Sequence, residues 1–371
     1  MYHSRATAIV ELESLGHRLN YVRLLAEHFA PPERLLLVSP SVAGSPEFEQ
    51  HLGHLEADVV VLAADDRATA LPDALAVATA RGAGHLVVPE ADKAVLPVLR
   101  ALLRGALRWA RPRRPRVTLL LMRTALPGGP EAATLGMALK PALVAVLRAL
   151  PGVRVLFLTD AFGVVTRRRG FPGVRPVRDP VTAPDPAPTG RAAGPRARVG
   201  VLGVIGARKN VPVLVAAAAR RPDVDVVLAG RCEPEVRAFL ATDPDAARLR
   251  AQGRLDVDDR LLDDAEFDAA LRSVDAVAVL HDNDAPSGIV AEAAARGVPV
   301  LGPDRGWVAT VLAATGGGVP ARVDDPGAVA AALDRLVAER TRYVAAACSS
   351  AASLGVADFV SGLVGGPGDQ E

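Results

Sequence analysis

Two acidic residues in the second half of the chain stand eight positions apart, with a turn and a helix start between them. The segment from position 284 reads DAPSGIVAEAAARGVPVLGPDRG, so Asp284 precedes a Pro-Ser-Gly turn and Glu292 follows it. Ser287 is a residue type that caps helices, and Gly288 can take the positive φ that such turns use. The pattern predicts an alanine-rich helix that begins after the turn and carries Glu292 one turn in. Its first N–H groups, around Ile289, would be unpaired donors.

The two carboxylates of this segment need explanations of their own. A carboxylate buried on an apolar helix costs several kcal/mol unless it is paired or hydrogen-bonded. Glu292 therefore either meets a partner inside the protein or faces a cleft, where it can bind hydroxyl groups; the alternative is a solvated surface glutamate. Asp284 follows the buried run VDAVAVL and lies at the carboxyl end of a strand, where ligands bind in α/β proteins. His281 ends the same run, and both a role in the site and a structural role are open.

A glycine loop with two basic residues is the second candidate site. Gly203 and Gly206 lie between a strand expected to run to position 202 and a helix expected near position 210, and Arg208 and Lys209 end the loop. Glycines let the backbone approach a ligand, and a helix start favours an anion. The loop therefore suits a phosphate or diphosphate; the alternative is an ordinary strand-loop-helix turn with two solvated basic residues. Lys209 is one of only three lysines in an arginine-rich chain.

The elements that must position these residues follow an α/β rhythm. Unbroken apolar runs, typical of strands buried on both faces, alternate with helical patterns, which predicts parallel sheets covered by helices. The rhythm breaks in a segment rich in proline and glycine and then restarts. We expect a Rossmann-like domain at 1–178, an interdomain linker at 179–196 and a second Rossmann-like domain at 197–345. A C-terminal helix and loose tail at 346–371 could pack back on the first domain.

Composition excludes several classes of function. The 43 basic and 42 acidic residues give a net charge of +1, so nothing attracts nucleic acid in general. The two cysteines form no metal or redox spacing, no secretory leader begins the chain, and no apolar run has membrane-spanning length. We expect a cytoplasmic protein. The basic residues Arg100, Arg104 and Arg108 lie at helical spacing and could contact the inner face of a membrane, but a solvated helix face is favoured.

The acidic pair and the glycine loop together resemble family 4 (group 1) glycosyltransferases. That family carries an acidic-x7-acidic motif followed by an alanine-rich helix and Gly-x-Pro-Val, here EAAARGVPVL. The loop GVIGARKN resembles the phosphate loop of the family, and the segment LAATGGGVPARVDDPGAVAAALDRL resembles its closing pattern. The resemblance covers about residues 198–340 and is weak in 1–178. It implies a GT-B fold, with two Rossmann-like doubly wound parallel-sheet domains facing across a cleft.

The resemblance also implies a role for each site residue. Lys209, helped by Arg208, would neutralise the donor diphosphate in the loop of Gly203 and Gly206. Glu292 would bind the ribose hydroxyls, and Asp284 would contact the transferred sugar. The remaining groups are backbone amides near the sugar or phosphate and residues of the first-domain loop against the donor or acceptor: Ser287, Gly288 and Ile289, and Gly16 and His17.

The same resemblance implies a retaining transfer from a nucleoside-diphosphate sugar to a hydroxyl acceptor, a small molecule, glycan or lipid, without a metal or other cofactor. The chain departs from the family pattern at several points. Asp284 stands where glutamate is usual, Val204 stands where many members have an arginine, and the first domain lacks a clear counterpart of the histidine that many members keep. The alternatives are therefore a catalytically silent GT-B partner protein and a GT-B nucleotide-sugar epimerase. The sequence leaves the sugar, the base, the acceptor and the oligomeric state open.

Overall fold

The chain folds into two compact units, each built around its own sheet. In the computed structural model the described residues are 6–14, 18–106, 114–122, 140–164, 173–182, 194–281, 287–351 and 354–365. The first unit consists of Met1–Thr159, Val165–Pro180 and Val356–Glu371. The second consists of Asp160–Val164 and Val181–Gly355.

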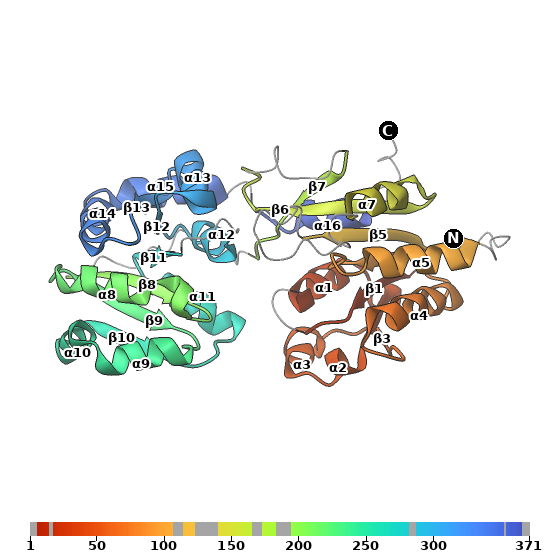
Figure 1. Ribbon diagram of the computed structural model, residues 1–371, viewed down its shortest axis with the longest axis horizontal. Coiled ribbons are helices and arrows are strands. Elements are labelled where there is room, and N and C mark those ends of the chain that lie inside the picture. Colours follow the sequence, from red (N-terminus) through yellow and green to blue (C-terminus); the bar gives the residue numbers. More distant parts are fainter. Residues whose placement is uncertain are drawn as a thin grey trace. The chain divides into compact units, whose positions relative to one another are not determined.

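The sheet of the first unit has seven parallel strands in the order β3-β2-β1-β4-β5-β6-β7 (Figure 1). Its strands are β1 (Thr7–Glu11), β2 (Arg34–Val38), β3 (Asp58–Val61), β4 (His85–Val88), β5 (Arg116–Leu121), β6 (Val153–Thr159) and β7 (Arg175–Arg178). The helices described in this unit are α1 (Arg18–Glu27), α2 (Pro40–Ala43), α3 (Pro46–Leu52), α4 (Arg67–Ala80), α5 (Val95–Ala106), α7 (Lys140–Ala149) and α16 (Ala357–Val364), with a 3₁₀ turn at Pro31–Glu33.

Both faces of this sheet are covered, as the unbroken apolar runs predict. Along β1, Ala8 and Val10 pack in one hydrophobic cluster and Ile9 packs in another, because successive side chains of a strand point to opposite faces. The cluster around Ile9 includes Leu25 of α1 and Phe359 of α16. The last described helix of the chain therefore completes the core of the first unit.

The sheet of the second unit has six parallel strands in the order β10-β9-β8-β11-β12-β13 (Figure 1). Its strands are β8 (Ala197–Leu202), β9 (Val224–Ala229), β10 (Leu255–Asp258), β11 (Ala276–Ala278), β12 (Val300–Pro303) and β13 (Gly318–Ala321). The helices described in this unit are α8 (Val211–Ala219), α9 (Pro234–Thr242), α10 (Pro244–Ala251), α11 (Asp264–Arg272), α12 (Gly288–Ala295), α13 (Gly306–Thr315), α14 (Pro326–Ala338) and α15 (Arg340–Ala351), with a 3₁₀ turn at Ala207–Lys209.

One large cluster forms the core of the second unit. Val199 and Val201 of β8 pack in it with Leu214 of α8, Leu249 of α10 and Leu333 of α14. The chain returns strand after strand to the same sheet through covering helices. The expectation of doubly wound parallel sheets is confirmed in both units.

The edge strands are where the sequence analysis and the structure differ. The strands β7, β10 and β13 lie at sheet edges and were not expected, because RPVR, LDVD and GVPA contain no unbroken apolar run. The fourth edge strand, β3, does contain an unbroken apolar run, DVVV, which is typical of a strand buried on both faces. Val59 and Val61 are exposed instead, because an edge strand has one neighbour. No helix among the described residues is long and apolar enough to cross a membrane.

Candidate functional site

The two motifs of the second unit meet at one edge of its sheet. Strands β8 and β11 are neighbours, yet the chain leaves β8 towards β9 and leaves β11 towards β12, on opposite sides. The carboxyl ends of such a strand pair form the crevice where doubly wound proteins bind ligands. The glycine loop follows β8 at Leu202, and His281 and the start of α12 follow β11. The topology thus brings together the residues that the sequence separates by about 80 positions.

The loop after β8 has the backbone geometry that its glycines predict. Gly203 has a φ of 84°, a left-handed value that favours glycine. The carbonyl of Gly203 lies against Gly230, where a Cβ would come within 2.0 Å of that oxygen. The loop ends in the 3₁₀ turn at Ala207–Lys209, and Asn210, with a φ of 53°, joins this turn to α8. The Nδ2 of Asn210 donates to the carbonyl of Val323 at 2.5 Å, which fixes the start of the helix.

The side chain of Lys209 is turned back towards the end of β8. Its Nζ donates to the carbonyl oxygen of Leu202, at the end of β8. Burial, and then the nearby charge of Arg208, lower the pKa of Lys209 to about 8. Arg208 is exposed and makes no hydrogen bond or ion pair with a described residue. Neither cation of the loop has a carboxylate partner within the described part of the chain, and both favour a bound anion.

His281 lies beside these two basic residues. It is buried at the end of the β11 segment. Its pKa is lowered by burial and then by the charges of Arg208 and Lys209. The imidazole is therefore neutral at physiological pH and within electrostatic range of the loop. Both a role in the site and a structural role for His281 stay open, and the electrostatic effect of Arg208 and Lys209 favours the first.

The helix α12 begins as the sequence predicts, at Gly288 after Ser287. Ser287 occupies the N-cap position, but its side chain accepts no hydrogen bond from the helix. The first N–H groups, including that of Ile289, thus keep the donor capacity of a helix N-terminus. The sheet edge that carries the basic loop also carries this helix start.

Glu292 has a partner inside the protein. Its Oε2 accepts from Nη1 of Arg296 at 2.6 Å, one turn later on α12. The Arg296 side chain is only 5% exposed and also pairs with Asp268 of α11 at 2.6 Å. The side chain of Glu292 remains 25% exposed. Of the readings open for Glu292, the structure shows the internal partner, and binding of ribose hydroxyls stays a prediction.

Arg296 is the residue of this site that the sequence analysis missed. The signal was its i+4 spacing from Glu292, at which opposite charges on a helix pair. Three residues expected at the site, Asp284, Gly16 and His17, lie outside the described residues. Within the described part of the chain, no group of three or more His, Cys, Asp or Glu residues is placed to hold a metal ion.

Solved structures share this architecture over nearly the whole chain. HepE from Anabaena in complex with UDP matches with a TM-score of 0.68 and 13% identity over 97% of this chain and 98% of that chain. A glycosyltransferase from Rickettsia africae ESF-5 matches with a TM-score of 0.70 and 10% identity over 98% and 97%. Sucrose-phosphate synthase from Thermosynechococcus elongatus matches with a TM-score of 0.63 and 15% identity over 96% of each chain.

These similarities define the fold as GT-B, the fold implied by the sequence resemblance. No family model and no curated protein matches the sequence. Membership of family 4 therefore stays a prediction.

Proposed function

We propose that this protein is a glycosyltransferase that moves a sugar from a nucleoside-diphosphate sugar to a hydroxyl acceptor. The observation that carries the proposal is the basic loop at the switch point of the second sheet. Arg208 and Lys209 offer positive charge there without a carboxylate partner among the described residues. The first N–H groups of α12, which the Ser287 side chain does not cap, lie at the same sheet edge. This combination suits the diphosphate of a donor.

The comparisons support the same class of donor. HepE has been solved with UDP and with UDP-glucose. Those ligands belong to HepE, and at 13–14% identity the base and sugar do not transfer. For this chain the proposal names the class of donor, a nucleoside-diphosphate sugar, and leaves its base open.

The chemistry that these residues can perform is stabilisation of a leaving diphosphate. As the bond to the sugar breaks, negative charge grows on the diphosphate, and preorganised cations and N–H donors lower the energy of that state. Lys209 would turn from Leu202 to the diphosphate, with Arg208 beside it. Glu292, fixed by Arg296, would bind the ribose, and Asp284 would read the sugar.

We further propose that transfer is retaining, hexosyltransferase-like and independent of metal, as the family resemblance implies. The two basic side chains supply the charge that a metal ion would otherwise supply. An unchanged transfer in chelator supports this part of the proposal, and a requirement for magnesium or manganese contradicts it.

The test is donor turnover by the full-length protein. UDP-, GDP-, ADP- and TDP-sugars are incubated with the protein, and released nucleoside diphosphate and altered sugar are measured. We expect release from at least one donor, and we expect Lys209→Ala to lower it roughly 10- to 1000-fold, because one charge-assisted contact is lost. The matched control is Arg248→Ala on α10, an exposed arginine paired with Asp245, which should leave turnover unchanged.

Three outcomes reject the proposal. If none of the donors binds, the protein has no site for these donors. Binding without turnover identifies a catalytically silent partner protein. Release of an epimerised sugar identifies an epimerase.

A further inference from the structure

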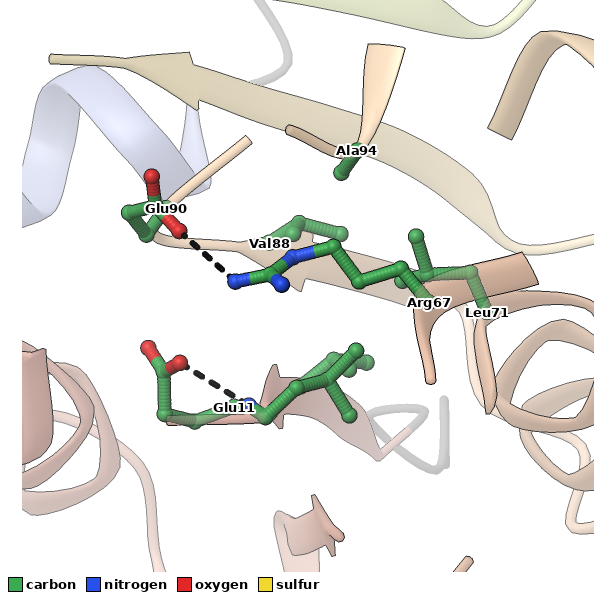
Figure 2. Close-up of a pocket in the computed structure, with 8 residues that line it drawn as sticks. Glu11, Arg67, Leu71, Val88, Glu90 and Ala94 are labelled. Atoms are coloured by element: carbon green, nitrogen blue, oxygen red, sulfur yellow. Dashed lines mark hydrogen bonds and ion pairs between the residues drawn. The ribbon is translucent and has the colours of Figure 1, made fainter. Parts of the chain in front are cut away.

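The first unit has a switch point of its own, and it is lined by carboxylates. Strands β1 and β4 are neighbours, and the chain leaves β1 towards β2 and β4 towards β5. Glu11 is the last residue of β1, and Glu90 lies two residues beyond β4. Figure 2 shows both carboxylates on the same side of a small cavity, with the guanidinium of Arg67 reaching them from the start of α4. Ligands of doubly wound proteins bind at this place.

Both carboxylates are buried and have hydrogen-bonding capacity left over. Glu11 is 3% exposed, and its Oε1 accepts from the N–H groups of Leu12 at 2.8 Å and Glu13 at 3.0 Å. Its Oε2 is buried and receives no hydrogen bond from any described residue. The Oε2 of Glu90 is in the same condition, with Arg67 Nη2 at 3.6 Å, beyond hydrogen-bonding distance. Such unpaired buried atoms are rare in folded proteins and point to a missing partner.

Charged groups from several elements face Glu11. They are Arg18 at the start of α1, Arg67 at the start of α4, and Glu90 after β4. Burial raises the pKa of Glu11 to about 8; the Leu12 N–H and Arg18 oppose this rise, and the charge of Glu90 adds to it. Glu13 pairs with Arg18, Arg67 and Lys93, so three cations stand against the carboxylates of Glu13 and Glu90 in the rest of the cluster.

The protonation of Glu11 gives the two carboxyl groups different roles. At neutral pH the Oε2 of Glu11 carries a proton and is a donor that finds no acceptor among the described residues. The Oε2 of Glu90, 3.6 Å from Arg67 and 3.8 Å from Arg18, is an acceptor that receives no hydrogen bond from the described part of the chain. A group that fits between them must accept one hydrogen bond and donate another.

The cavity between these groups is small and partly apolar. It has a volume of about 10 Å³, about the room that one water-sized group needs. Its walls come from Val10, Leu71, Val88 and Ala94 besides the polar residues. An anion would meet the charge of Glu90, and an apolar group would leave both oxygens unpaired. A hydroxyl group matches the size and both hydrogen bonds.

We propose that Glu11, Glu90 and Arg67 bind one hydroxyl group of a neutral polyhydroxy compound, a sugar or polyol, at the switch point of the first sheet. This compound would be the acceptor, an assignment that rests on the proposed function. The binding itself does not rest on it, because every group of the site belongs to the first unit.

The test is binding of neutral glycosides to the full-length protein without any donor. Saturation-transfer NMR at pH 7 and pH 9 uses glycerol and the methyl glycosides of glucose, galactose, mannose and N-acetylglucosamine. We expect at least one of them to bind at pH 7. Glu11 loses its proton as the pH rises through about 8, so binding should weaken about tenfold by pH 9.

Two isosteric variants separate the roles of the carboxyl groups. Glu11→Gln keeps an acceptor for the Leu12 N–H and supplies a permanent donor, so binding should stay within about threefold and lose its pH dependence. Glu90→Gln removes the charged acceptor and should weaken binding roughly 10- to 100-fold. Glu56→Gln, at an exposed glutamate before β3, is the control and should behave as the wild type.

The same samples are titrated with UDP, GDP, ADP and TDP, so the two proposals fail separately. Nucleotide binding without binding of any of the five polyhydroxy probes overturns this inference and leaves the proposed function standing. Binding of a probe without nucleotide binding overturns the proposed function and leaves this inference standing. Equal pH dependence in the wild type and in Glu11→Gln also overturns the inference, because the pH dependence of probe binding would then not come from Glu11.

Discussion

Replacing Lys209 with methionine should make the stability of the protein respond differently to pH. In the folded protein, burial of the ammonium group and then the nearby charge of Arg208 lower the pKa of Lys209 from 10.5 to about 8. The unfolded chain therefore binds more protons than the folded one between pH 8 and 10.5. Stability from this group rises with pH through that window, and below pH 8 the full cost of the charged lysine is present.

The size of the effect follows from the pKa. A difference from 10.5 to about 8 corresponds to roughly 3 kcal/mol at about 1.36 kcal/mol per pH unit. Part of this cost is relieved because the side chain retains some contact with water, so we expect about 1–3 kcal/mol. The free energy of unfolding of Lys209→Met, relative to that of the wild type, should thus be higher at pH 7 than at pH 10 by about this amount.

Urea unfolding of both proteins at pH 7 and pH 10 measures how their difference in free energy of unfolding changes with pH. Loss of the hydrogen bond to Leu202 and changes in packing are nearly the same at both pH values, so they largely cancel. Arg248→Met on α10 is the control and should show no such pH effect, because its guanidinium stays charged throughout. A value near zero for Lys209→Met, or one of opposite sign, would refute the reasoning about the loop.

Three other predictions concern the same unit. Glu292→Gln should weaken binding of plain nucleoside diphosphate, whereas Asp284→Asn should leave that affinity nearly intact and lower transfer; calorimetry and a transfer assay decide, and equal losses of affinity contradict the two roles. Transfer should survive EDTA, and recovery only on adding magnesium or manganese contradicts this. Gly230→Ala should cost roughly 2–4 kcal/mol in urea unfolding, because its Cβ would meet the Gly203 carbonyl. Gly253→Ala also has a positive φ but meets no atom within 4 Å, so it should cost about 1–2 kcal/mol; equal costs for both exclude the backbone clash.

The interior of the fold was predictable because central strands carry their own signal. A strand buried on both faces needs apolar residues at every position, and runs such as VRVLFLT and VDVVLAG predict β6 and β9 directly. The edge strand β3 carries such a run, DVVV, although Val59 and Val61 are exposed, whereas the edge strands β7, β10 and β13 carry none. Their existence depends on the sheet beside them rather than on their own sequence.

The candidate site also has a part that was predictable from the sequence and a part that was not. Local features were predictable: the loop from Gly203, the helix start at Ser287 and the cation at Lys209 all follow from neighbouring residues. The contact of Lys209 with the Leu202 carbonyl was not, because it depends on how the loop folds back on β8. The site of Glu11 and Glu90 was also missed. Each residue follows an apolar strand, in ATAIVEL and GHLVVPE, but their proximity comes only from the pairing of β1 with β4.

The donor site is tested by a crystal structure of the protein with a bound nucleoside diphosphate, chosen from UDP, GDP, ADP and TDP by calorimetry. We expect the diphosphate at the carboxyl end of β8, against the loop from Gly203 to Asn210 and the start of α12. We also expect Lys209 to leave the Leu202 carbonyl and to contact a phosphate oxygen. A nucleotide bound elsewhere, or a diphosphate at the loop with Lys209 still on Leu202, would contradict this prediction.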